Sequence, residues 1–206
     1  MKRTAPPNPN LDTLKSDSQS QPMRLYLDTE FTTLNQSAKL LSIGVVDANG
    51  RSFYAELSDT AIPEDKWLQD NVLCHMQWLN SSTTPFLQTA SDHWQGYLSH
   101  SELAKALKDW LKVYPQAEVW ADCVVWDWIL FCELFGGAFE KPSNLYYLPF
   151  DLVTLLKVKG IDTDIKRTDL LTQLGKTSDT LQHHALSDAT QTKDIVETLL
   201  NEPSTL

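Results

Sequence analysis

The clearest periodicity of the chain lies in its first quarter. Apolar and polar residues alternate from Met23 to Phe31, as they do in a strand with one buried face. Residues 39–46 and 51–57 are also rich in apolar residues, and the Asn49-Gly50 pair between them favours a tight hairpin turn. The pattern therefore predicts that the fold opens with an antiparallel meander.

Residues 63–97 break this pattern. They carry scattered aromatic residues, and apolar residues recur with helical spacing in places, notably at Trp67, Val72 and Leu73. No run within the segment clearly indicates a strand. We interpret residues 63–97 as a helical insertion.

Strand and helix patterns alternate in the second half of the chain. Ser101 is suited to cap a helix that continues to Val113, and Gly136-Gly137 are suited to end a helix over residues 126–135. Other predicted elements are strands at 117–121 and near 145–148, and helices over 150–158 and about 187–200. Strands first and alternation later predict an α/β or α+β domain with a mixed sheet.

Composition supports one domain that follows a flexible tail. The chain has 206 residues, of which 42% are apolar, and its 7 Trp can help to fill a sizeable core. Residues 1–22 are rich in Pro, Asn, Ser and Gln, a composition that cannot offset the entropy of ordering. We expect a flexible tail over 1–22 and a single domain over 23–202.

Cysteine content and hydropathy indicate the cellular compartment in which the protein acts. Cys74, Cys123 and Cys132 are odd in number and widely spaced, which supports neither a disulfide framework nor a zinc site. The longest apolar stretch, residues 119–135, contains three acids, and the N-terminus lacks the apolar core of a secretory signal. We therefore expect a cytoplasmic protein without a membrane partner.

The formal net charge of −10 limits the kind of nucleic acid that the protein could bind. Proteins that hold long nucleic acids depend on many Lys and Arg contacts to phosphates. An enzyme that holds only the end of a strand needs few such contacts, and metal ions would add positive charge. The charge therefore constrains substrate length more than substrate class.

Asp28 and Glu30 form the first group of residues with chemical potential. They lie two residues apart near the end of the first predicted strand, so both side chains leave the same face. Two such carboxylates repel each other unless a cation lies between them. A pair of solvated acids at a strand end explains the same residues equally well.

Asp127 is the second feature. It lies in an apolar stretch, where an ionised carboxylate is costly without a partner such as a metal ion. A helix N-cap is the alternative, because Asp127 stands near the start of a helical pattern. Asp122 is a nearby rival at the end of the preceding strand, and the cost of burial favours Asp127.

The third feature is the segment His183-His184-Ala185-Leu186-Ser187-Asp188, which leads into the last predicted helix. Asp188 falls in the first helical turn, and both histidines lie on the loop before it. A capping Asp and two exposed histidines would explain the same residues.

In this order the three features resemble the motifs of the DEDDh exonucleases, which include oligoribonuclease, ribonuclease T and proofreading exonuclease domains. That family carries Asp-x-Glu, an interior Asp and His-x-Ala-x-x-Asp. The resemblance covers about residues 23–200 and implies a ribonuclease H-like fold with a mixed central sheet and flanking helices. Many relatives have Asn four residues before the interior Asp, where this chain has Cys123.

The resemblance also implies a mechanism and a set of roles. Two Mg²⁺ or Mn²⁺ ions would be held by Asp28, Glu30, Asp127 and Asp188. His183 would be the general base that accepts a proton from the attacking water, and His184 would fill the variable position. The products would be nucleoside 5′-monophosphates released from the 3′ end of a short single strand.

Substrate contacts are less specific in the sequence. Phe31, Leu34 and Trp128 stand beside the motifs and could contact bases, although such residues are more often part of a core. A basic stretch could follow the phosphates or simply face solvent, and it comprises Lys157, Lys159, Lys166, Arg167 and Lys176. The Trp-rich insertion is similar to that of a bacterial and phage branch of exoribonucleases, which favours RNA over DNA.

Two other functions are compatible with the sequence. One is a non-catalytic nucleic-acid-binding module on the same fold, and the other is a metal-dependent phosphohydrolase of small nucleotides. The order of all five motif positions favours the exonuclease. The sequence leaves the oligomeric state open, a homodimer included.

Overall fold

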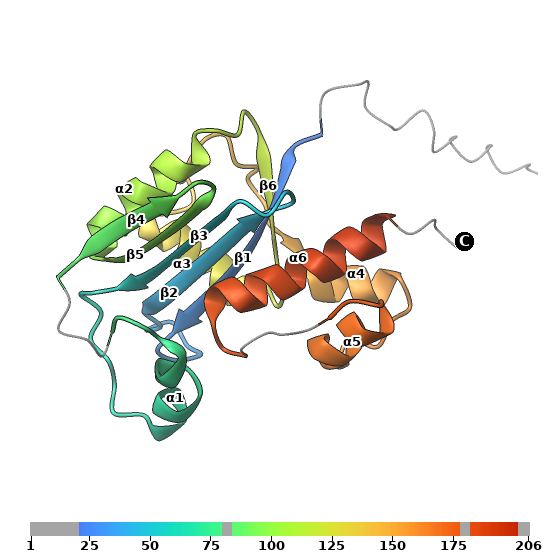
Figure 1. Cartoon of the computed structure of the whole chain (residues 1–206), viewed down its shortest axis with the longest axis horizontal. Helices are drawn as coiled ribbons and strands as arrows, with labels where there is room; N and C mark the ends of the chain where they lie inside the picture. Colours follow the sequence, from blue (N-terminus) through green and yellow to red (C-terminus); the bar gives the residue numbers. More distant parts are fainter. Residues whose placement is uncertain (1–20, 80–83, 178–181, 202–206) are drawn as a thin grey trace, which may run out of the picture.

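One mixed sheet organises the computed structural model, which describes residues 21–79, 84–177 and 182–201. Seven strands lie in the order β4-β5-β3-β2-β1-β6-β7 (Figure 1). Their bounds are β1 Met23–Phe31, β2 Leu40–Asp47, β3 Ser52–Leu57, β4 Phe86–Ala90, β5 His93–Leu98, β6 Ala117–Ala121 and β7 Phe150–Asp151. Strands β1, β2 and β3 form the antiparallel meander that the sequence predicts, whereas β6 pairs with β1 in parallel.

Helices cover both faces of this sheet. They are α1 Lys66–Asn71, the 3₁₀ helix η2 Leu73–His75, α2 His100–Leu111, α3 Val125–Leu134, α4 Leu152–Val158, α5 Arg167–Gln173 and α6 Ala185–Asn201. Helix α6 lies across one face, with α4 and α5 beside it, while α2 and α3 lie behind the sheet in Figure 1. The predicted α/β architecture with a mixed sheet is confirmed.

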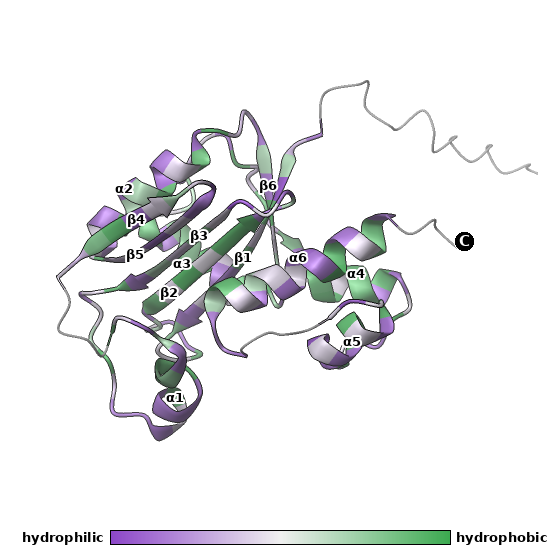
Figure 2. Ribbon diagram, viewed as in Figure 1, coloured by the Kyte–Doolittle hydropathy of each residue, from purple (hydrophilic) through white to green (hydrophobic). Residues whose placement is uncertain are grey.

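The alternation of side chains along β1 and β2 divides the core into two layers. Leu25 and Leu27 of β1 pack into a cluster with α2 and α3, whereas Tyr26 packs on the opposite face with α4, α5 and α6. Figure 2 shows that β2 is mostly hydrophobic and that α6 mixes hydrophobic and hydrophilic residues, as an amphipathic helix does. Burial on both faces therefore fixes the register of the central strands.

The structure of residues 63–97 differs from the predicted helical insertion. Helices α1 and η2 form its first half, but the prediction that it contains no strand is wrong, because β4 and β5 form a hairpin. Strand β5 pairs with β3 in parallel and extends the sheet. The hairpin carries Gln88, Thr89 and Gln95 at exposed positions, so its strands are stabilised by pairing with β3 rather than by an apolar pattern of their own.

Smaller differences occur at element ends. Ser99 rather than Ser101 caps α2, since its N–H and its hydroxyl both donate to the Glu102 carboxylate. The strand predicted near 145–148 contributes only a bridge between Leu145 and Ala117, and the helix predicted from residue 150 begins after β7. Helix α5 was not predicted. Of the predicted tail, only residues 21 and 22 are described. Residue 202, the predicted end of the domain, also lies outside the described residues.

None of the helices in residues 21–79, 84–177 and 182–201 is both long enough and apolar enough to cross a membrane.

Candidate active site

A close approach between α6 and β2 brings the first and third sequence motifs together. Gly44 of β2 stands opposite Asp28 of β1 in the sheet register. A Cβ at Gly44 would lie 2.3 Å from the backbone nitrogen of Leu186, so only glycine allows the start of α6 to rest on the sheet here. The first turn of α6 consequently places Asp188 beside the carboxylates of β1.

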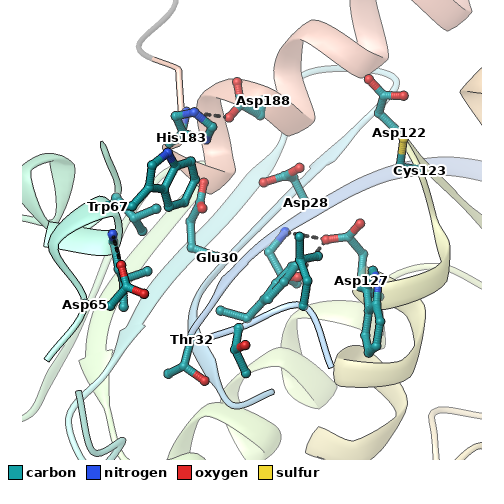
Figure 3. Close-up of a pocket in the computed structure, with 17 residues that line it drawn as sticks. Asp28, Glu30, Thr32, Asp65, Trp67, Asp122, Cys123, Asp127, His183 and Asp188 are labelled. Atoms are coloured by element: carbon teal, nitrogen blue, oxygen red, sulfur yellow. Dashed lines mark hydrogen bonds between the residues drawn. The ribbon is translucent and has the colours of Figure 1, made fainter. Parts of the chain in front are cut away.

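Three of the predicted acids form one cluster (Figure 3). Asp28, Glu30 and Asp188 each offer a carboxylate oxygen, and these oxygens all lie within 4.8 Å of one another. Glu30 is buried, whereas Asp28 and Asp188 are half-buried. The arrangement can hold a cation whose ligands are carboxylate oxygens.

Asp127 is held beside this cluster by the strand that carries the first motif. Its Oδ1 accepts a hydrogen bond from the Thr29 backbone N–H at 2.9 Å and another from the Thr29 hydroxyl at 2.6 Å. Thr29 lies between Asp28 and Glu30, so the contact fixes Asp127 next to both. Asp127 is the third residue of α3 and does not cap it, because the N-cap is Val124.

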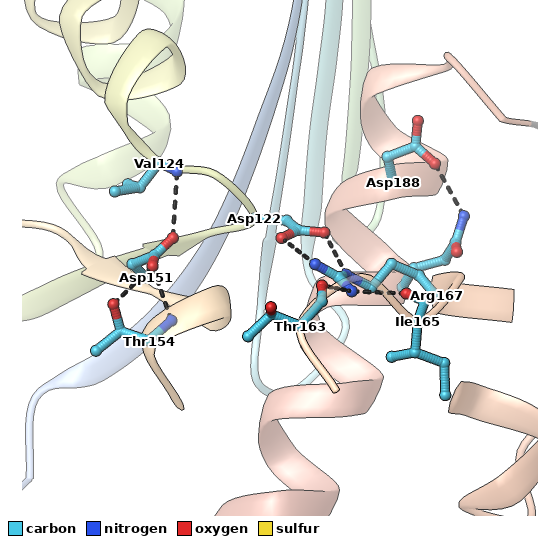
Figure 4. Close-up of polar contacts among 9 residues, drawn as sticks. Asp122, Val124, Asp151, Thr154, Thr163, Ile165, Arg167 and Asp188 are labelled. Carbon is cyan, nitrogen blue, oxygen red and sulfur yellow. Dashed lines mark hydrogen bonds and ion pairs between the residues drawn. The ribbon is translucent and has the colours of Figure 1, made fainter. Parts of the chain in front are cut away.

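Asp122 has a different partner. Its two carboxylate oxygens accept hydrogen bonds from Arg167 Nε at 2.6 Å and from Nη2 at 2.9 Å (Figure 4). It lines the same cavity as the cluster without being one of the three clustered acids. The structure therefore separates the two rivals, with Asp127 tied to the motif strand and Asp122 tied to α5.

Burial in the site makes ionisation of the four predicted acids unfavourable. Burial raises the pKa of Glu30 to about 8, and the charges of Asp188 and Asp127 act in the same direction. Burial likewise raises the pKa of Asp28 well above its usual range, with further contributions from Asp127 and Glu30. The pKa values of Asp127 and Asp188 rise to about 6, again because of burial. Divalent cations would remove this penalty.

His183 lies at the edge of the same cluster. Its backbone takes a left-handed conformation with φ of 58°, and its N–H donates to Asp188 Oδ2 at 2.9 Å. The ring of Trp67 meets it edge-on, with the ring centroids 5.5 Å apart. Burial lowers the pKa of His183, so its imidazole is neutral near pH 7 and able to accept a proton.

The side chain of His184 does not face the cluster of acids. Its ring stacks on Tyr54 with centroids 4.5 Å apart, and its Nδ1 accepts a 3.4 Å hydrogen bond from the Ser187 N–H. It does not line the cavity that contains the acids. Of the two adjacent histidines, the structure thus places only His183 beside the carboxylates.

The cavity around the acids has a volume of about 490 Å³. Phe31 and Leu34, two of the three residues proposed to contact bases, line it, and Leu34 is 72% exposed. Trp128 does not line it, because it packs against the core and stacks on Phe131 at 5.4 Å. Trp126, two positions earlier on the chain, lines the cavity instead, since each residue of a helix turns the side chain by about 100°.

Two contributions to the site were not predicted. Trp67 of α1 lines the cavity and is 59% exposed. Glu56 of β3 is fully buried, and its carboxylate accepts hydrogen bonds from the backbone N–H groups of Gln77, Trp78 and Leu79. It thereby anchors the insertion that carries Trp67. The Trp-rich composition of the insertion was a weak indication that Trp67 could have a role in the site. Nothing near Glu56 in the sequence indicated its role.

The predicted basic stretch is divided by the fold. Lys166 and Arg167 line a neighbouring cavity of about 280 Å³ that also contains Asp28, His183 and Asp188. Lys157, Lys159 and Lys176 line neither this cavity nor the one around the acids.

Comparison with known protein families gives a match over most of the chain. Residues 23–200 match the family described as the 3'-5' exoribonuclease Rv2179c-like domain. Two relatives from strains of Mycobacterium tuberculosis, the 3'-5' exoribonucleases MT2234.1 and Rv2179c, are each 30% identical to this chain over 142 residues. The alignment covers 67% of this chain and 76% of each relative.

Solved structures share the fold at low sequence identity. The nuclease domain of 3'hExo, a DEDDh family member bound to rAMP, superposes with a TM-score of 0.61 at 15% identity, over 89% of this chain and 94% of that one. S. pombe Pop2p in its Mg²⁺- and Mn²⁺-bound form gives a TM-score of 0.55 at 13% identity, over 85% and 81% of the two chains. The fold is therefore that of the DEDDh exonucleases, as the resemblance implied.

Proposed function

The chain belongs to the 3'-5' exoribonuclease Rv2179c-like family, and from this premise we propose how it acts. It is a metal-dependent exonuclease that releases nucleoside 5′-monophosphates from the 3′ end of short single-stranded RNA. The observation that carries the proposal is the convergence of Asp28, Glu30 and Asp188 within 4.8 Å, with Asp127 tied to the same strand. Two matching relatives are named 3'-5' exoribonucleases, which supports RNA over DNA.

The chemistry of the four acids fits a pair of divalent cations. All four are carboxylates whose pKa values are raised by burial, and cations would offset that cost. Hard oxygen donors suit Mg²⁺ or Mn²⁺ better than zinc. When bound, such ions would activate a water and stabilise the charge that develops on the leaving 3′ oxygen. The residues that would hold the ions are Asp28, Glu30, Asp127 and Asp188.

His183 is the proposed general base. Its lowered pKa leaves the ring neutral at the pH of the cell, and its backbone hydrogen bond to Asp188 holds it beside the proposed ligands. A neutral imidazole there can accept the proton of the attacking water. General-base catalysis of this kind contributes about 10²–10⁴-fold to the rate.

The shape of the cavity supports a substrate held by its last nucleotide. A volume of about 490 Å³ is in the range of small-molecule sites. Its apolar lining includes Phe31, Leu34 and Trp67, which offer surfaces for a base and a sugar. Among the described residues that line this cavity there is no Lys or Arg, in keeping with a chain of net charge −10 that holds a strand end.

The experiment that tests this function follows a 5′-labelled RNA over time. A one-nucleotide ladder and nucleoside 5′-monophosphates should appear with Mn²⁺ or Mg²⁺, and neither should appear with EDTA. The matched controls are the Asp28→Asn variant and an RNA whose 3′ end is blocked by a phosphate. Products from the middle of the strand, or turnover of free dinucleotides alone, would contradict the proposal. A DNA of the same sequence measures the preference for RNA.

The proposal also covers where the protein acts and how it assembles. Three widely spaced cysteines that fit no disulfide framework favour a reducing compartment, so the proposed location is the cytoplasm. A homodimer stays a prediction, which light scattering of the purified chain would test.

A further inference from the structure

A fifth carboxylate stands at the site without belonging to the motif. Asp122 follows β6, lines the cavity of the acids and also lines the neighbouring cavity that contains Lys166 and Arg167. Asp28 and Asp188 line both of these cavities together with Asp122. Asp122 is therefore close enough to the proposed ligands to change their electrostatics.

Arg167 engages both oxygens of this fifth carboxylate. The guanidinium forms two hydrogen bonds with Asp122, at 2.6 and 2.9 Å, in the bidentate geometry that suits an arginine and a carboxylate. Its Nη1 donates to the backbone oxygens of Thr163 and Ile165, at 3.1 and 2.8 Å (Figure 4). The two side chains are 20% and 24% exposed, so solvent screens the pair only in part. Such contacts leave Arg167 little freedom to turn toward a substrate.

The fold supplies this arginine from a helix outside the three motifs. Arg167 is the first residue of α5, and Leu170 and Leu171 of that helix are buried in the cluster that includes α6. Packing of α5 on α6 therefore sets where the guanidinium lies. The same α6 carries Asp188, so a single packing arrangement positions both a proposed ligand and the partner of Asp122.

We propose that Arg167 is a positioning residue that neutralises Asp122 and holds its carboxylate away from the bound cations. The inference rests on the proposed function, because it concerns the same site. The charges of two divalent cations balance four carboxylates. A fifth, unpaired carboxylate would leave a net negative charge facing the phosphodiester and would compete for the cations.

Removal of Arg167 should therefore separate cation binding from substrate binding. In Arg167→Ala the freed Asp122 should tighten Mn²⁺ binding and raise the KM for RNA, each by about tenfold, the effect of one added charge near the site. Asp122→Asn should shift both quantities in the opposite direction, since Arg167 then lacks its counter-charge. The double variant should return both to near the wild-type values.

A second ion pair provides a matched control. Arg24 forms a bidentate pair with Glu197 at 2.8 Å, with side chains 29% and 21% exposed, and neither residue lines the two cavities. Arg24→Ala should lower thermal stability while leaving Mn²⁺ affinity and KM unchanged. A purely structural role of Arg167 would give this same result.

The measurements are Mn²⁺ titration by calorimetry without RNA, and KM and kcat for a short RNA at saturating Mn²⁺. The inference is overturned if Arg167→Ala changes neither Mn²⁺ affinity nor KM, or if the double variant is as impaired as the single one. If Arg167→Ala does not fold, Asp122→Asn decides alone, and unchanged Mn²⁺ affinity and KM would refute the inference. Failure of the proposed function would appear separately, as a wild-type protein that releases no mononucleotides with Mn²⁺.

Discussion

Replacing Glu30 with Gln should stabilise the metal-free protein at alkaline pH. Glu30 is buried beside Asp28 and Asp188, and its pKa is raised to about 8 from a usual value of 4.5. Folding therefore favours the protonated acid. Ionisation of Glu30 therefore lowers the stability of the folded protein. This loss of stability is absent below pH 4.5, grows as the pH rises from 4.5 to 8, and is complete above pH 8. The amide of the Glu30→Gln variant would be neutral throughout this window.

The magnitude follows from the change in pKa. A tenfold change in an ionisation constant corresponds to about 1.4 kcal/mol, so the ionisation penalty of Glu30 is about 4 kcal/mol at pH 8. At pH 5.5 the same calculation gives about 1 kcal/mol. The cost of burying the Gln amide does not depend on pH. The stability advantage of Glu30→Gln over the wild type should thus fall by about 3 kcal/mol between pH 8 and pH 5.5.

Urea unfolding in EDTA at the two pH values measures this difference. Glu133→Gln, an exposed substitution on α3, is the matched control and should show no such pH dependence. Mn²⁺ at about 100 times its Kd should then stabilise the wild type by about 2.7 kcal/mol at pH 8, and Glu30→Gln by clearly less. The reasoning is refuted if the advantage of Glu30→Gln is the same at pH 5.5 and pH 8.

Three further substitutions test individual roles in the site. Asp188→Asn should abolish RNA turnover and weaken Mn²⁺ binding while circular dichroism shows a folded protein; measurable turnover at wild-type Mn²⁺ would exclude Asp188 as a ligand. His183→Ala should lower kcat by about 10²–10⁴-fold with Mn²⁺ affinity retained, and a wild-type kcat at pH 7 would exclude it as the base. Thr29→Val removes one of the two hydrogen bonds to Asp127, so kcat should fall by about tenfold, whereas Thr29→Ser should restore it.

Local patterns in the sequence were sufficient to predict the central strands and the order of the acids. Alternation from Met23 to Phe31 is a local property, because adjacent residues of a strand leave opposite faces whatever lies beyond them. The same periodicity places Asp28 and Glu30 on one face. Asn49-Gly50 likewise specifies a hairpin through the conformations that these two residues allow.

Packing of the sheet and helices selects which other residues join the site. The sequence favours Asp127 over Asp122 only through the cost of burial, whereas in the structure their partners, Thr29 and Arg167, separate the two. The choice of Trp126 over Trp128 depends on how α3 is rotated against the core. The β4–β5 hairpin likewise exists because β3 offers an edge for pairing, which the hairpin's own polar residues do not indicate.

The two kinds of feature differ in how far apart along the chain the residues that specify them lie. Strand periodicity and turn preference depend on residues within a few positions of one another. The hydrogen bond from Thr29 to Asp127 joins residues 98 positions apart, and the approach of α6 to Gly44 depends on the absence of a single side chain. Such contacts form only when sheet and helices pack together, so the sequence supplied the acids and the packing selected their neighbours.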